Sequence, residues 1–353
     1  MKQEAVVEPS DATSVLGAFQ RAASRLLPSL NVRRAYSIDD EKALIVEAAS
    51  PAGRPITLRV EVRELLVPSR VREWLRQLKR HPGRDVIRIA GTRFLSPRVR
   101  EICREEGVGY LDLAGNCWLR SGEVYLERVV DHNPFPMRGR PPSLFSMASS
   151  RVVRAMLEEP QRGWGVAELA RETGISVGQA SNVCRRLLDE AYAQRTHRKI
   201  WLAQPAKLLE AWAEIYRLAD HRQLVYYTFE RDHGRLLARV ADVGRTQQLR
   251  YAVTMFAAAG LVAPFVRGVG LVQWYIESEA ALEGWVRALD LRPVESGPNV
   301  GLLIPADAGV FYRTRAVNGI TLAGNVQLYM DLHNDPARGR EQAEFLRKQV
   351  LPY

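Results

Sequence analysis

Hydrophobic positions over the first 130 residues fall into short blocks that alternate between strand and helix patterns. Two segments carry apolar residues at three- and four-residue intervals and predict helices, at 69–80 and 96–107. Ser69 and Ser96 stand where helix N-caps belong, and Pro97 occupies a first turn. Strands are predicted for five apolar runs, at residues 43–49, 56–65, 85–91, 109–120 and 123–130. This alternation indicates an α/β or α+β domain.

The periodicity stops at residues 131–143, where four prolines and two arginines form the stretch DHNPFPMRGRPPS. Such a composition is typical of an exposed linker between domains. A second boundary is expected at Pro205, where a strand pattern changes to an amphipathic helix pattern. We therefore expect an α+β protein with three domains, at 1–133, 143–204 and 205–353.

Residues 150–174 carry two short helix patterns. Ser150 is the expected N-cap of the first helix, and Leu169 and Ala170 are the expected inward residues of the second. Gly174 then supplies a left-handed residue that turns the chain sharply. Ser176 is expected to cap a third helix.

The third helix has one apolar and one polar face. Apolar residues recur at three- and four-residue intervals and should face the other helices: Val177, Ala180, Val183, Leu187 and Leu188. The opposite face carries small or polar residues, namely Gly178, Gln179, Ser181, Asn182, Arg185 and Arg186. Glutamine suits adenine and arginine suits guanine in a DNA major groove. The alternative is a packed helical subdomain whose polar face is simply solvated.

Residues 191–204, AYAQRTHRKIWLAQ, predict two short strands joined by a basic turn that contains Arg195, His197, Arg198 and Lys199. Tyr192 and Trp201 are expected in the core rather than on bases. Together with the helices, this stretch resembles the winged helix-turn-helix family of bacterial transcription regulators over about residues 145–204. The resemblance implies that the basic turn is a wing that contacts the DNA backbone.

In the first domain, Glu61-Val62-Arg63 lies in a predicted strand that precedes a helix. This order is similar to the restriction-endonuclease-like fold, in which a carboxylate and an E-x-K motif hold a divalent metal. Arg63 occupies the lysine position, so we expect a degraded site, with Asp40 or Glu47 as the only candidates for the earlier acid. The alternative function is a metal-dependent DNA nuclease or resolvase. Asp112 and Asn116 are interpreted as a turn signal rather than a polar site.

After Pro205 the chain again mixes helices and strands. Residues 251–266 predict a buried helix and a turn, and residues 325–351 predict two helices around Asp335-Pro336. Strands are expected within 268–278, 300–306 and 309–317. The stretches NVGLLIPADAGVFYR, GITLAGNVQLYMDL and ARGREQAEFLRKQVL resemble the C-terminal region of the AbiEi family, antitoxin regulators of type IV toxin-antitoxin systems.

The AbiEi resemblance, with the winged helix, spans roughly residues 145–350. It implies a repressor of its own operon and a nucleotidyltransferase toxin as partner. Family members usually begin with the winged helix, whereas this chain has some 140 residues in front of it. This departure counts more against the antitoxin role than against DNA binding. A toxin-neutralising binding protein is the alternative to a DNA-binding regulator.

Charge and composition narrow the functional class. The net charge is +10 and the pI is about 9.7, which favours a polyanionic partner. Three scattered cysteines support neither a disulfide framework nor a zinc site, and no run of residues is long and apolar enough for a membrane span. We expect a cytoplasmic, homodimeric regulator that binds double-stranded DNA, and no enzyme, metal, cofactor or membrane partner.

Overall fold

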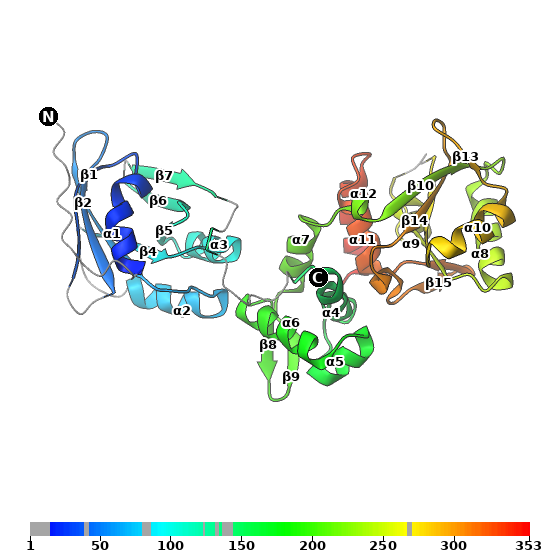
Figure 1. The fold of residues 1–353 in the computed structure, drawn as a ribbon, viewed down its shortest axis with the longest axis horizontal. Coiled ribbons are helices and arrows are strands. Elements are labelled where there is room, and N and C mark those ends of the chain that lie inside the picture. The colour runs from blue at the N-terminus through cyan, green and yellow to red at the C-terminus, as the bar shows by residue number, and fades with distance from the viewer. Residues whose placement is uncertain are drawn as a thin grey trace. The chain divides into compact units, whose positions relative to one another are not determined.

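The computed structural model describes residues 15–38, 42–79, 86–122, 124–130, 134–135, 144–266 and 270–353. The chain divides into two compact units, Met1–Arg140 and Pro141–Tyr353. Each unit contains a seven-stranded mixed sheet with helices, so the α+β class is confirmed (Figure 1). Most of the predicted linker lies outside the described residues. The same holds for residues 133 and 143, where the first domain is expected to end and the second to begin. The three-domain division stays a prediction.

The sheet of the first unit follows the chain in order from β1 to β7. Strands β3, β4 and β5 pair in parallel, and the pairs on either side of them are antiparallel. The elements are α1 Val15–Leu26, β1 Asn31–Ser37, β2 Ala43–Ala49, β3 Pro55–Val62, α2 Pro68–Lys79, β4 Val86–Thr92, α3 Pro97–Glu105, β5 Gly109–Asp112, β6 Cys117–Ser121 and β7 Val124–Arg128. The sequence patterns indicated these elements except α1 and β1, but the single strand run expected at 109–120 is divided into β5 and β6.

The two faces of this sheet are covered by different helices. Phe19 and Leu26 of α1 belong to one apolar cluster with β2 and β3, and α2 and α3 contribute to a second. Ser96 caps α3 as expected and Pro97 begins it. Ser69 does not cap α2, because that helix already begins at Pro68 and Ser69 lies in its first turn.

Asp112 and Asn116 form a closed turn, as the sequence indicated. Asp112 is fully buried, and its carboxylate accepts hydrogen bonds from the backbone of Leu95, Gly115 and Asn116 at 2.8 Å. The Asn116 side chain donates to it at 2.7 Å. Burial raises the pKa of Asp112, although these donors act in the opposite direction. The carboxylate is therefore saturated by the turn it stabilises.

The second unit begins with three helices and a two-stranded hairpin, and a mixed sheet with further helices follows. Its sheet has the order β13-β10-β14-β12-β11-β16-β15, in which β12–β14 and β11–β16 are parallel pairs. The helices are α4 Met147–Glu158, α5 Val166–Thr173, α6 Val177–Asp189, α7 Pro205–Ala213, α8 His233–Thr246, α9 Met255–Val262, α10 Leu282–Leu289, α11 Asn325–His333 and α12 Gly339–Val350, with short 3₁₀ turns η1 Leu218–Asp220, η2 Glu279–Ala281 and η3 Ala308–Phe311. The strands are β8 Ala193–Thr196, β9 Lys199–Leu202, β10 Arg222–Tyr227, β11 Tyr251–Thr254, β12 Val272–Ile276, β13 Arg292–Pro293, β14 Val300–Ile304, β15 Arg315–Val317 and β16 Ile320–Leu322.

One apolar cluster runs through the whole second unit. It includes Val152 and Met156 of α4, Leu187 of α6, and Leu328 and Leu346 of α11 and α12. The two C-terminal helices flank Asp335-Pro336 as expected. Within the described residues, no helix is long and apolar enough to cross a membrane.

Three expectations for the helices and strands of this unit need correction, and one of them, the strand within 309–317, is wrong only for its first part. Residues 251–254 form the buried strand β11, and only then does helix α9 begin. Residues 309–317 hold a 3₁₀ turn before the short strand β15. Ser150 does not cap α4, which begins at Met147 with Ser146 as N-cap; the Ser150 hydroxyl instead donates to the Met147 carbonyl at 2.7 Å.

The turn between α5 and α6 generates a stability prediction. Gly174 has φ +66°, a conformation that costs a side-chain-bearing residue about 1 kcal/mol. Gly174→Ala should lower the free energy of unfolding by about that amount in urea titrations followed by tryptophan fluorescence.

Gly178→Ala is the matched control, because Gly178 lies in α6 and a Cβ added there meets no atom within 4 Å. This variant should leave stability unchanged or raise it by up to about 1 kcal/mol. If both variants lost the same free energy of unfolding, the left-handed conformation of Gly174 would not be the reason for its effect.

Candidate nucleic-acid interface

The α5–α6 corner is fixed at each end by local hydrogen bonds. The Glu168 side chain accepts from the Gly165 N–H at 3.1 Å at the start of α5, and the Gly174 and Ile175 backbone closes its end. Ser176 caps α6, and its hydroxyl accepts from the Gln179 N–H at 3.2 Å. The Gln179 side-chain oxygen in turn accepts from the Ser176 N–H at 3.2 Å. This is a capping box, and it holds the first turn of α6 rigidly.

The inner face of α6 packs against α4 and α5. Ala180, Val183 and Leu187 are buried as expected, and Leu188 is half-buried against the same core. Val177 is 56% exposed, so its expected inward position is wrong. The apolar stripe reaches the neighbouring helices only from the second turn onward, and the first residue of the helix lies outside that contact.

The stripe also contains Cys184, which the apolar pattern had not included. Its side chain is fully buried, and burial raises the pKa of the thiol to about 11. A thiol with this pKa stays protonated at neutral pH, so Cys184 is a packing residue. The other two cysteines are also unpaired and buried.

The outer face of α6 is polar and exposed. Its exposed residues are Ser176, Gly178, Gln179, Ser181, Asn182 and Arg185. Arg185 donates to the Asn182 side-chain oxygen at 2.5 Å, so the two side chains are held together. Arg186 differs from the others because it is half-buried and its Nε donates to Glu190 at 2.7 Å. The sequence placed all of these on one face, but it did not reveal that Arg186 is paired.

The β8–β9 hairpin presents the basic residues. Its tip is tight, with Thr196 opposite Lys199 and His197 at φ +57°. Arg195, His197, Arg198 and Lys199 are all exposed. Figure 1 shows the hairpin extending beyond helices α4–α6.

The base of the hairpin is anchored in the core. Trp164, in the α4–α5 connection, and Ile200 of β9 exchange two backbone hydrogen bonds of 2.9 Å. This antiparallel bridge places Trp164 beside the hairpin as a third strand would lie. Tyr192 is buried as expected, and Trp201 is half-buried with its ring against Gly163. A rigid base and an exposed basic tip are therefore combined in one short element.

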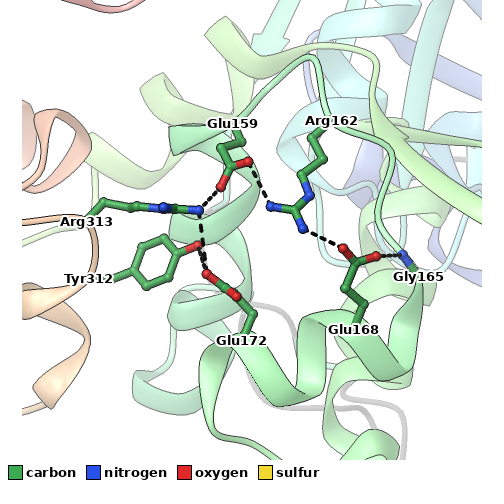
Figure 2. Close-up of polar contacts among 7 residues, drawn as sticks. All are labelled: Glu159, Arg162, Gly165, Glu168, Glu172, Tyr312 and Arg313. Atoms are coloured by element: carbon green, nitrogen blue, oxygen red, sulfur yellow. Dashed lines mark hydrogen bonds and ion pairs between the residues drawn. The ribbon is translucent and has the colours of Figure 1, made fainter.

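Acidic residues beside these helices are bound by arginines. Glu159 accepts from Arg162 at 2.8 Å and also pairs with Arg313, and Glu168 pairs with Arg162 at 2.5 Å (Figure 2). Glu172 accepts from the Tyr312 hydroxyl at 2.8 Å. These contacts reduce the negative charge that α4 and α5 would otherwise place near a polyanion.

Helix α4 is tied to the rest of the second unit by charged and polar contacts that the sequence did not reveal. Arg151 makes a two-pronged ion pair with Asp307 at 2.8–3.0 Å, and the buried Arg154 donates to Gln327 at 2.6 Å. Glu158 accepts from the Val326 N–H at 2.9 Å, at the start of α11. Helix α4, and with it α5 and α6, is therefore fixed to the part of the second unit that follows residue 205.

Near these contacts lies a polar network centred on Asp331, which is only 1% exposed. Its carboxylate accepts from Tyr216 at 2.6 Å, Tyr275 at 2.8 Å and Gln327 at 2.6 Å, and also from Thr254. Burial raises the pKa of Asp331 while these donors lower it. Because protein donors fill its acceptor positions, the network is structural, as buried polar groups generally must be satisfied.

The nuclease-like motif of the first unit is engaged in ion pairs. Glu61 pairs with Arg59 at 2.7 Å and with Arg88 at 3.8 Å. Arg63 lies beyond the end of β3, and its guanidinium is over the Trp74 ring at 5.7 Å. Glu47 accepts from the Tyr36 hydroxyl at 3.2 Å.

Of the two candidates for the earlier acid, Asp40 lies outside the described residues. No group of three or more His, Cys, Asp or Glu side chains suited to a metal occurs in the described part of the chain. Glu61 is thus engaged by arginines.

The seam between α4 and α11 generates a pH prediction. Burial raises the pKa of Glu158 from an ordinary value of 4.5 to about 7. The native state therefore binds the Glu158 proton more tightly than the unfolded chain does. The stabilisation of the native state by this proton is complete below pH 4.5 and is lost as the pH rises to 7. Glu158→Gln keeps an oxygen for the Val326 N–H but has no charge to bury.

The free energy of unfolding should be measured for Glu158→Gln and the parent protein at low and high pH. Between a pH below 4.5 and a pH above 7, the free energy of unfolding of the variant should rise relative to that of the parent protein by on the order of 3 kcal/mol. Glu214→Gln is the control, because Glu214 is exposed. A difference independent of pH would contradict the inferred burial of the charge.

Comparison with known proteins yields one family and one structural likeness. No curated protein matches the chain. The apo form of EndoMS matches over 30% of this chain and 47% of its own, with a TM-score of 0.21 and 11% sequence identity. That score does not establish a shared fold. Residues 201–352 match the family described as transcriptional regulator, AbiEi antitoxin, type IV TA system. Over these matched residues, 201–352, the chain is therefore similar to the AbiEi antitoxin family of transcriptional regulators.

Proposed function

We propose that this protein is a transcription regulator that binds duplex DNA through a winged helix formed by α4–α6 and β8–β9. The single observation that carries the proposal is the division of α6 into an apolar face that is packed from Ala180 onward and an exposed polar face. A helix held rigidly from behind, with donors and acceptors in front, is the form in which proteins enter the major groove. The family description, transcriptional regulator, supports the same function.

Base selection would rest on Gln179, Asn182 and Arg185. Arg185 suits guanine, and its bond to Asn182 fixes the direction of the guanidinium before DNA arrives. The Gln179 oxygen is committed to the cap, so its NH₂ group is the part available to a base acceptor. Gly178 and Ser181 are small enough for the helix to approach the groove closely. Each good base contact contributes on the order of 1–3 kcal/mol of discrimination.

The hairpin would contact the sugar-phosphate backbone. Arg195, Arg198 and Lys199 lie at an exposed tip and offer cations without a base-specific geometry, and His197 is exposed beside them. Arg186 is half-buried and paired with Glu190, so it would contribute less to the attraction of the DNA backbone. Binding through such residues weakens steeply with salt, because counterions are released from the DNA.

A homodimer would complete the specificity. One winged helix reads few base pairs, whereas two half-sites a helical turn apart supply a longer operator. The antitoxin part of the family description supports autoregulation of a toxin-antitoxin operon. We propose a nucleotidyltransferase toxin as the second product of that operon. Neutralisation of this toxin by direct contact is the rival role, and a toxin-binding assay would separate it from DNA binding.

Two substitutions separate base reading from backbone contact. Arg185→Ala should relax the preference at one base position, because it removes a side chain aimed at base edges. Lys199→Ala should weaken binding to all sequences and flatten the salt slope by about one unit. Operators selected from random duplexes, followed by fluorescence anisotropy at several salt concentrations, measure both effects.

Arg287→Ala is the matched control, because Arg287 is 80% exposed on α10 and pairs only with Glu283 in the described residues. It should leave preference and salt slope unchanged. If Arg185→Ala and Lys199→Ala both left an intact footprint, the assignment of α6 and the hairpin to DNA would be wrong.

A further inference from the structure

A cavity lies in the second unit, away from the proposed DNA-binding face. Its volume is about 590 Å³, and its walls come from helix α8, the start of β11 and the β15–β16 hairpin. Ala238 and Ala241 of α8 form an apolar side, and Thr314 and Asn318 lie opposite. This volume is within the range of about 300–1,000 Å³ found for small-molecule sites.

The charged residues of the cavity favour an anion. Arg245 and Asp242 both line it and pair with each other, which largely cancels their charges. Arg250 is different, because its guanidinium lies over the Phe311 ring at 4.5 Å and has no carboxylate partner among the described residues. A guanidinium backed by an aromatic ring keeps its donors directed outward and suits a phosphate or carboxylate.

A hydroxyl adds a neutral donor to this wall. The Tyr251 oxygen accepts from the Thr321 N–H at 3.0 Å, so its own proton is available to a ligand acceptor. The apolar alanines and the turn at Asn318-Gly319 leave room beside these donors for the body of an organic molecule.

The cavity adjoins the contacts that hold α4 and α5. Thr314 lines the cavity and directly follows Arg313, which pairs with Glu159 and lies 3.7 Å from Glu172 (Figure 2). Arg313 has φ +55°, an unusual conformation for a residue with a side chain, so the segment is held in place by its contacts. Tyr312, one residue earlier, donates to Glu172.

We propose that this cavity binds a small organic anion carrying phosphate or carboxylate groups, and that Phe311–Thr314 transmits its occupancy to the α4–α6 helices. A ligand drawn to Arg250 changes the support of the Phe311 ring and presses on Thr314. Both residues flank Tyr312 and Arg313, whose partners lie at Glu159 and on α5. The second half of this inference rests on the proposed DNA binding, and the first half does not.

Calorimetric titration of the full-length protein tests the cavity without DNA. The probes are pyrophosphate, citrate and adenosine 5′-monophosphate, which separate phosphate, carboxylate and phosphate with an aromatic body. At least one probe should bind with a Kd of about 1 mM or lower, and Arg250→Gln should weaken it at least about tenfold. Ala238→Trp, which narrows the cavity and removes no charge, should also weaken binding, while Arg287→Gln should not change it.

DNA affinity then tests the transmission. The bound probe should change the Kd for the selected operator at least about fivefold in the parent protein, and have no effect in Arg313→Gln. The cavity proposal is overturned if no probe binds, or if Arg250→Gln and Arg287→Gln behave alike. The transmission is overturned if a probe binds and operator affinity does not move. If the parent protein binds no DNA, the proposed function fails, and calorimetry still decides the cavity.

Discussion

The second unit depends on the burial of helix α4 on more than one side. Val152, Val153, Ala155, Met156 and Leu157 are all fully buried, a run too continuous for a helix with one solvated face. The charged residues of the same helix must therefore find partners inside the protein, since burying an unpaired charge is costly. They find them at Asp307, which caps the 3₁₀ turn η3, and in α11.

This constraint explains why α4 exposes little surface, whereas α6 and the hairpin each have an exposed polar side. One side of α4 packs on α5 and α6, and its charged side meets Asp307, Gln327 and the start of α11. Solvent reaches the polar face of α6, the basic tip of the hairpin, and Ala167, Arg171 and Glu172 of α5. The same anchoring gives the C-terminal region a physical means of acting on the helices, through the residues of Figure 2.

The candidate sites of the first unit have a different character. The carboxylates that could have suggested metal chemistry are engaged by protein groups: Glu61 pairs through Oε1 with two arginines, and Asp112 is saturated by a turn and the Leu95 N–H. In each case the residue type that signals chemistry in a sequence is used for stability. A carboxylate that already accepts several hydrogen bonds has little left to offer a metal ion.

The sequence by itself determined the local features: the capping residues Ser96 and Ser176, the left-handed Gly174, most strands and helices, and the two faces of α6. Such features depend on periodicity and on backbone chemistry within a few residues, and both are visible in one dimension. Only the tertiary structure decided that Val177 is exposed, that Ser150 lies inside a helix, and that Arg186 is paired. It also brought Arg154 to Gln327 and Arg151 to Asp307 across about half the chain. Contacts between residues so far apart follow from how whole elements pack, for which local patterns carry no signal.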